Sequence, residues 1–123
     1  MFFKIRVGLF ISLLIFFATS TVFAGPSMPK KLASEFTQYP NSTIIHTITS
    51  NEMVQVILHC GNEPMDTVFD YYKEKASQSG WTDSMEIKSV DVYQLMITKN
   101  NQDGMIVVTS ENGETSVVLS ISN

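Results

Sequence analysis

Residues 64–80 read PMDTVFDYYKEKASQSG, and this stretch carries the strongest structural signal in the chain. Its apolar side chains recur at the spacing of one helical face, at Met65, Val68, Phe69, Tyr72 and Ala76. Pro64 suits the first turn of a helix that Asn62 would cap, and Gly80 suits the position just after its end. The sequence therefore predicts one amphipathic helix from about residue 64 to residue 79.

Two strand patterns precede this helix, at residues 43–49 and 53–60. Ser50, Asn51 and Glu52 lie between them and predict a hairpin loop. With a three-residue loop, the register places Ile44, His46 and Ile48 on one face with Val54, Val56 and Leu58, and leaves Thr47, Gln55 and His59 on the other.

Four strand patterns follow the helix, at residues 85–90, 92–99, 105–110 and 115–121. Asn112-Gly113 predicts a two-residue turn, because both residues tolerate positive φ. That turn would pair Val108 with Val117 and place Glu111 opposite Glu114. Residues 100–104 predict a longer hairpin loop.

The order β-β-α-β-β-β-β predicts an α+β fold: a single two-layer domain with a mostly antiparallel sheet and one amphipathic helix over one face. We expect this domain to span residues 32–123, after a flexible lead-in at residues 25–31. Within its first residues, Leu32, Phe36 and Tyr39 are spaced to anchor a short helical turn that Pro40 would end.

The first 24 residues have the pattern of a signal peptide. Lys4 and Arg6 precede an apolar run from residue 7 to residue 18, and small residues near position 24 predict cleavage between Ala24 and Gly25. We therefore expect a periplasmic or secreted protein that meets the membrane only during export. The alternative is an N-terminal membrane anchor that is retained, because residues 7–24 are long enough to cross a bilayer.

The chain after residue 24 is acidic. It holds all 12 Asp and Glu but only six of the eight Lys and Arg, which gives a formal charge of −6. Nucleic acid is therefore not an expected partner, because phosphate binding needs clustered cations. Cys60 is the only cysteine, so no disulfide can form within the chain; we expect it to be buried or to pair with another chain.

No sequence motif points to catalysis, to a cofactor or to a metal. His59 and Cys60 are neighbours on a predicted strand, so their side chains point to opposite faces. The two histidines of the chain do not have zinc-site spacing. We expect a protein that is not an enzyme and binds neither metal nor cofactor. A small envelope enzyme is the alternative if the fold brings His46 or His59 beside a carboxylate in a cleft.

Two candidate binding regions stand out. Asp66, Asp70 and Glu74 form an acidic stripe on the outer side of the predicted helix, and Tyr71 is predicted to point away from the core, so together they suggest a partner surface. A merely solvated helix face is the alternative interpretation. Separately, the aromatic residues Tyr72, Trp81 and Tyr93 would line an apolar ligand site between helix and sheet, or fill the core.

The landmarks Tyr39-Pro40, Tyr71-Tyr72 and Gly80-Trp81, in this order, resemble a group of small uncharacterised bacterial exported domains over most of residues 32–121. The resemblance implies an α+β fold in the cell envelope and brings no reaction. Many of those domains look like lipoproteins, whereas this leader lacks the cysteine that would carry the lipid.

Export, small size and the acidic stripe together lead us to expect a non-catalytic domain of the bacterial cell envelope. It would bind another envelope protein or a surface through its helix or an exposed strand edge. The alternative is a small carrier or sensor of an apolar ligand.

Overall fold

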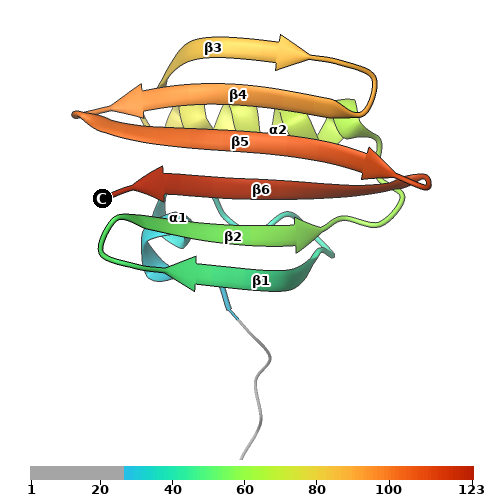
Figure 1. The fold of residues 1–123 in the computed structure, drawn as a ribbon, viewed down its shortest axis with the longest axis horizontal. Helices are drawn as coiled ribbons and strands as arrows, with labels where there is room; N and C mark the ends of the chain where they lie inside the picture. Colours follow the sequence, from blue (N-terminus) through green and yellow to red (C-terminus); the bar gives the residue numbers. More distant parts are fainter. Residues whose placement is uncertain (1–26) are drawn as a thin grey trace, which may run out of the picture.

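The computed structural model describes residues 27–123, which form a six-stranded antiparallel sheet with two helices on one face (Figure 1). The predicted signal peptide at residues 1–24 and its cleavage site lie outside the described residues. Within residues 27–123, no helix has the length and apolar character needed to cross a bilayer.

Eight elements make up the domain: α1 (Lys30–Glu35), β1 (Thr43–Thr49), β2 (Met53–His59), α2 (Met65–Gln78), β3 (Thr82–Lys88), β4 (Val92–Lys99), β5 (Gln102–Glu111) and β6 (Glu114–Ser122). The strands lie in the order β1-β2-β6-β5-β4-β3. This confirms the predicted α+β fold and the order β-β-α-β-β-β-β. The short helix α1 precedes that series and begins inside the predicted lead-in.

Helix α2 lies close to its predicted position, because the apolar face and the glycine that follows the helix both indicate the same segment. The backbone N–H of Trp81 donates to the carbonyl of Ala76 at 2.9 Å, and that of Gly80 donates to Ser77 at 3.1 Å. These two bonds form a Schellman motif, with Gly80 at φ +90° as its left-handed residue. The predicted cap at Asn62 is wrong: Pro64 occupies the N-cap position, and no side chain caps this end.

Pro40 does not end helix α1 as predicted. The helix stops at Glu35, and Phe36 already has a non-helical φ of −131°. Leu32, Phe36 and Tyr39 are nevertheless buried, as their spacing predicted. Their side chains anchor α1 and residues 36–42 to the core.

The predicted register of β1 and β2 is correct only at the end of the hairpin that lies away from its loop. Ile44 pairs with Leu58, but a bulge at Ile45 shifts the ladder, so that His46 pairs with Ile57 and Thr47 with Val56. Because one extra residue turns every later side chain to the other face, His46 and Ile48 point away from the helices and Thr47 points toward them.

The last four strands form two tight hairpins and one looser one. Asn112-Gly113 is a two-residue turn with Glu111 opposite Glu114, which confirms that prediction. The predicted loop at residues 100–104 is wrong. Asn100 and Asn101 alone make a turn, with φ of +51° and +65°, and Lys99 pairs with Gln102. Strand β3 starts at Thr82 instead of residue 85.

The core lies between the helices and one face of the sheet. Helix α2 packs against β4 and β5, while α1 packs against β2 and β6. The sheet contributes alternate residues to this core, chiefly Val54, Val56, Leu58, Leu95, Ile97, Ile106, Val108, Val117, Leu119 and Ile121. The other face of the sheet carries no helix in the described part of the chain, as Figure 1 shows.

Candidate functional site

The uncovered side of the sheet, which we call the open face, is built from the strand residues that alternate with the core residues. Its clearest feature is a methionine row. Met85 on β3 pairs with Met96 on β4, which pairs with Met105 on β5. Met85 is 52% exposed and Met96 36%. Three thioether side chains therefore stand side by side on neighbouring strands.

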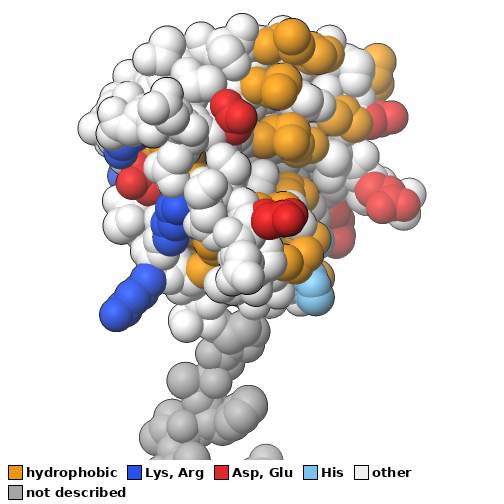
Figure 2. Space-filling view, turned by 60° about the vertical axis from the view of Figure 1, so that its left-hand side comes forward, with side chains coloured by type: hydrophobic (Ala, Val, Ile, Leu, Met, Phe, Trp, Pro, Cys, Tyr) orange, Lys and Arg blue, Asp and Glu red, His pale blue; other side chains and the backbone are white. Residues whose placement is uncertain are grey.

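A second row crosses the middle of the open face, and we call it the central row. Val107 on β5 pairs with Val118 on β6, which pairs with Ile57 on β2. The row continues to Gln94 and Ile87 at the β3 side, where Ile87 is 50% exposed. The apolar residues of the two rows are neighbours on the face, with Gln94 between Val107 and Ile87, and Figure 2 shows hydrophobic side chains in a band across the strands.

Ionised side chains are confined to the rim of the open face. By strand alternation, the acidic residues on this side are Asp103, Glu111 and Glu114, and all three lie at or next to strand ends. Between them the polar groups are neutral amides and hydroxyls, such as Gln55, Gln94 and Ser120, apart from the two histidines. An apolar centre with a polar rim is the composition of protein interfaces.

A shallow depression lies on the open face beside the methionine row. It has a volume of about 370 Å³ and is lined by Met53, Met96, Met105, Gln55, Ser120 and their neighbours. Unbranched thioether side chains adapt their shape to what they contact, so this region is suited to accept a partner side chain.

The two edge strands are less suited to binding. A bulge interrupts β1 at Ile45 and another interrupts β3 between Asp83 and Met85. Such bulges break the regular row of free N–H and C=O groups that an added strand would need. Addition of a strand at either edge is therefore disfavoured.

The predicted acidic stripe is exposed, but its charges are partly engaged. Asp66 lies 4.0 Å from the Lys88 ammonium, and Glu74 accepts a hydrogen bond from Gln78 at 3.2 Å. Asp70 and Glu74 border a groove of about 640 Å³ between α2 and the start of β3.

Tyr71 does not point away from the core, so that prediction is wrong. Its ring packs edge-on against Tyr39 with centroids 4.9 Å apart, and its hydroxyl lies 3.0 Å from that of Thr37. The connection from α1 to β1 covers the helix side that a helical wheel leaves free, so Tyr71 is half-buried and not available as predicted.

Two of the predicted ligand-lining aromatics serve the core. Tyr72 is fully buried and donates its hydroxyl to the Thr37 carbonyl at 2.9 Å; burial raises its pKa. Trp81 is 5% exposed and stacks on Phe36 with centroids 6.1 Å apart. Tyr93 lies at the edge, half-buried, with the Lys88 ammonium 4.9 Å from its ring centroid.

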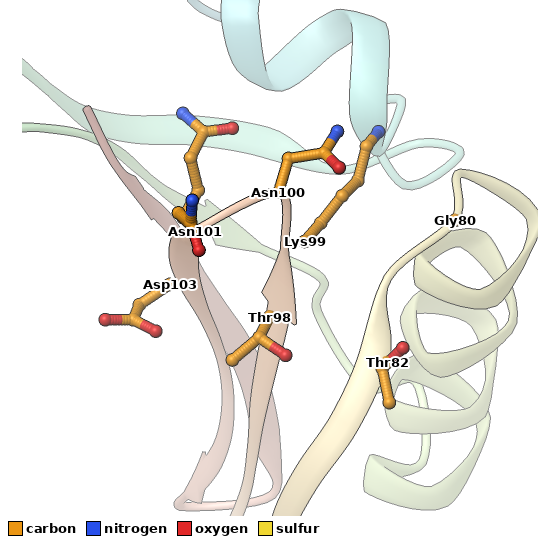
Figure 3. Close-up of a pocket in the computed structure, with 8 residues that line it drawn as sticks. Gly80, Thr82, Thr98, Lys99, Asn100, Asn101 and Asp103 are labelled. Carbon is orange, nitrogen blue, oxygen red and sulfur yellow. The ribbon is translucent and has the colours of Figure 1, made fainter.

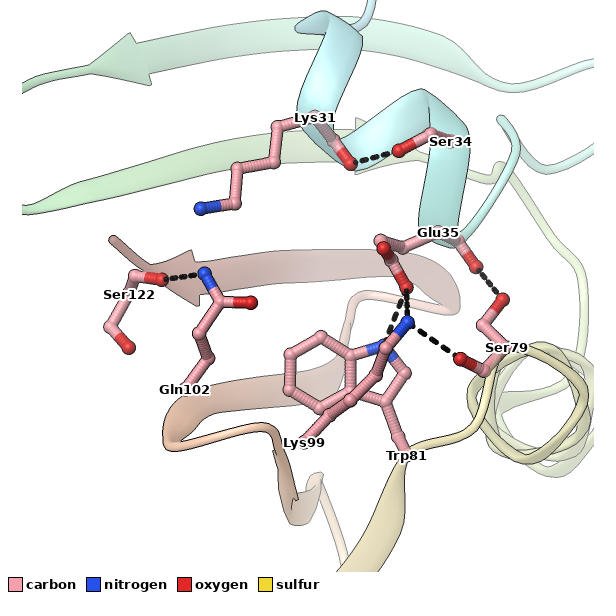
Figure 4. A network of polar contacts seen from close by, with 8 residues as sticks. All are labelled: Lys31, Ser34, Glu35, Ser79, Trp81, Lys99, Gln102 and Ser122. Carbon is pink, nitrogen blue, oxygen red and sulfur yellow. Dashed lines mark hydrogen bonds and ion pairs between the residues drawn. The ribbon is translucent and has the colours of Figure 1, made fainter.

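A polar network beside Trp81 could not be predicted from the sequence, because it joins three segments that are far apart along the chain (Figure 4). The Glu35 carboxylate accepts hydrogen bonds from Trp81 Nε1 and Lys99 Nζ, both at 2.9 Å. Lys99 also donates to the Ser79 carbonyl at 2.7 Å. Burial alone would raise the pKa of Glu35, but the bonds from Lys99 and Trp81 outweigh it and lower this pKa. The network ties α1 to the end of α2.

An open hollow of about 550 Å³ lies next to this network, around the turn between β4 and β5 (Figure 3). Its lining is polar, with Thr82, Thr98, Asn100, Asn101 and Asp103 around it. The cation that borders it, Lys99, is already paired with Glu35. The hollow therefore offers hydrogen-bonding groups but no free cation within the described residues.

Another hollow, of about 370 Å³, lies at the end of β2, and its lining includes His59, Cys60, Glu63 and Tyr39. His59 Nε2 lies 3.2 Å from Glu114 Oε1, and both side chains are substantially exposed. Tyr39 donates to Glu63 at 2.7 Å, and burial with this bond raises the pKa of Tyr39 to about 12.

A catalytic site in this hollow would need an activated nucleophile, and the Cys60 thiol is not activated. Burial, reinforced by the Glu63 charge, raises the pKa of the Cys60 thiol to about 11, so it is protonated at neutral pH. Across residues 27–123, no group of three His, Cys, Asp or Glu side chains is placed to hold a metal ion.

Searches against protein-family models, curated proteins and solved structures found no match to this chain. The resemblance to small exported bacterial domains therefore stays a prediction.

Proposed function

We propose that this protein is an exported, non-catalytic binding module of the bacterial cell envelope, and that it binds another protein through the open face of its sheet. The observation that carries the proposal is the pair of uncovered rows, the methionine row and the central row, in register across neighbouring strands.

Solvent exposure of this face is costly, which supports its use as a contact surface. Water-exposed apolar area costs about 25 cal/mol per Å², and soluble monomers rarely leave large contiguous apolar patches uncovered. On the helix side, the helices cover the four inner strands β2, β6, β5 and β4, while most residues of the edge strands β1 and β3 are exposed. A partner on the open face would bury its apolar centre and leave the acidic rim in water.

The open face is a better candidate than the acidic stripe on α2. Asp66 and Glu74 each have a partner within the chain, and Tyr71 supports the core. Exposed single ion pairs contribute little free energy, whereas the buried centres of protein interfaces are enriched in methionine and depleted of charged residues.

A photo-crosslinking residue tests this proposal in the cell that makes the protein. It is placed at Gln94, in the middle of the open face, and as a matched control at Thr67, which is exposed on α2. We expect a crosslinked protein adduct from position 94 and little from position 67. Adducts from position 67 alone would overturn the assignment of the open face.

Export is tested separately by the intact mass of the protein recovered from the periplasm or medium. We expect a chain that begins at Gly25. A chain that keeps residues 1–24 would instead support the retained membrane anchor.

A small hydrolase is a second candidate, because His59 lies beside the Glu114 carboxylate, which is the kind of contact that an enzyme of this size would need. Two observations weigh against it: the pair is exposed, and the nearby Cys60 thiol is buried with a raised pKa. Hydrolysis of a panel of activated esters by the purified protein, lost in His59→Asn, would favour this candidate over a binding module.

A further inference from the structure

We infer that the partner on the open face is a second copy of this chain, packed sheet against sheet. The inference rests on the proposed function, since it names the protein that would cover the same surface. Three properties of the face support it: its area, its distribution of charge and its chemical symmetry.

The area of the face matches the lower end of what a stable dimer needs. Six strands at a spacing of about 4.8 Å and seven residues of about 3.3 Å each give roughly 600 Å² of sheet. Two copies would therefore bury at most roughly 1,200 Å², since the acidic rim stays in water, and this is where the range of specific interfaces begins. We expect a dissociation constant in the micromolar range rather than an obligate dimer.

The distribution of charge on the open face permits self-association although the chain as a whole is acidic. After residue 24 the chain carries a formal charge of −6, so two copies repel one another at long range. The centre of the open face has no carboxylate, and its acidic groups, Asp103, Glu111 and Glu114, lie at the rim. Contact through this face keeps the carboxylates of the two copies at the wet edge, where salt screens them.

The face is also chemically complementary to itself. The amides of Gln55 and Gln94 each carry a donor and an acceptor, so each can pair with its own symmetry mate. Methionine side chains adapt to one another, and two twisted sheets pack face to face at about −30°. A twofold pair of these faces would make a two-sheet sandwich with a helical layer on each outer side.

Sedimentation equilibrium of the exported protein, recovered from its host, tests this inference. We expect a concentration-dependent monomer-dimer equilibrium that tightens when salt is raised, because the carboxylates are screened and the apolar contact is strengthened. A partner chosen by opposite charge would show the reverse dependence on salt.

The matched variants are Met96→Lys, in the methionine row, and Thr67→Lys, on exposed α2. Both add one cation, so they change the net charge equally. We expect Met96→Lys to weaken the dimer at least tenfold, because a charged, hydrated ammonium would replace an apolar side chain inside the contact, where Asp103 at the rim is the carboxylate nearest to it along the strands, and Thr67→Lys to leave it unchanged or slightly tighter. If Met96→Lys fails to fold by circular dichroism, Met85→Lys at the more exposed edge replaces it.

The outcomes separate the two proposals. A protein that stays monomeric up to about 1 mM overturns the second copy; adducts from position 94 to a different protein would then leave the proposed function standing. A dimer that Thr67→Lys disrupts and Met96→Lys does not would overturn both.

Discussion

Replacement of Gly104 by alanine tests the packing that holds β4, β5 and Trp81 together. A Cβ at this position would lie 2.9 Å and 3.1 Å from Cγ1 and Cδ1 of Ile97, and 3.2 Å from Cζ3 of Trp81. All three distances are shorter than ordinary carbon contacts, and both neighbours are buried. The sheet therefore uses glycine here because Ile97 and the indole of Trp81 together fill the space that a side chain would need.

The magnitude follows from two opposing contributions. Overpacking of a core costs about 1–3 kcal/mol, while Gly→Ala in a strand regains about 0.5–1 kcal/mol of backbone entropy. We expect Gly104→Ala to lower the free energy of unfolding by about 1–2 kcal/mol, and Tm by roughly 5–15 °C for a domain of this size. Urea titration followed by fluorescence of Trp81, the only tryptophan, measures it.

A double-mutant cycle assigns the cost to the contact with Ile97. Ile97→Val alone should cost about 0.5–1.5 kcal/mol. In the Gly104→Ala background it should cost less, because it removes the Cδ1 atom that crowds the new methyl group. A Gly104→Ala protein more stable than the original, or strictly additive costs, would refute this reasoning.

Three further predictions concern the rest of the domain. Glu35→Gln should destabilise the fold by about 1–2 kcal/mol at pH 7, because Lys99 loses its ionic partner. The pKa of Glu35 in the folded protein lies below its ordinary value of 4.5, so the difference in stability between the variant and the original protein should shrink as the pH falls through that lowered pKa. Urea titrations from pH 7 to acid measure this difference. The Cys60 thiol, with its pKa raised to about 11, should react slowly with a thiol reagent in the native protein and quickly in denaturant; rapid native labelling would contradict its burial. Asn101→Gly should stabilise the turn between β4 and β5 by about 0.5–1 kcal/mol, because this residue has a φ of +65°, and an unchanged or lower melting temperature would count against the turn assignment.

Local signals predicted most of the elements. The apolar face of α2 and the glycine after it placed that helix, and Asn112-Gly113 fixed one hairpin with its register. Asn100-Asn101 carried a similar signal, because asparagine tolerates positive φ. The polar residues after it predict a loop, whereas Gly104 lies within β5, next to Trp81.

Features that depend on distant segments could not be predicted. The bulge at Ile45 arises from the fit of β1 to β2 and to the core, and it reverses the facing of His46 and Ile48. The half-buried state of Tyr71 depends on Tyr39, which a different segment brings to it. Likewise, Glu35 of α1 meets Lys99 of β4 only once α1 lies on the sheet.

The open face does leave a signal in the sequence. The runs MIVV at residues 105–108 and VVL at residues 117–119 are apolar without alternation, which is typical of strands buried on both faces. The row formed by Met85, Met96 and Met105 was beyond sequence reasoning, because it requires the order and register of three strands.

The exposure of the methionine row inside the cell tests the central claim most directly. Mild peroxide treatment converts exposed methionines to sulfoxides, and mass spectrometry reads the rate at each position. We predict that Met85 and Met96 are oxidised several-fold more slowly in intact cells than in dilute purified protein, while Met65, on α2, changes little once the rates are normalised to a free methionine peptide. Equal normalised rates at Met85 and Met96 in both settings would contradict a covered open face.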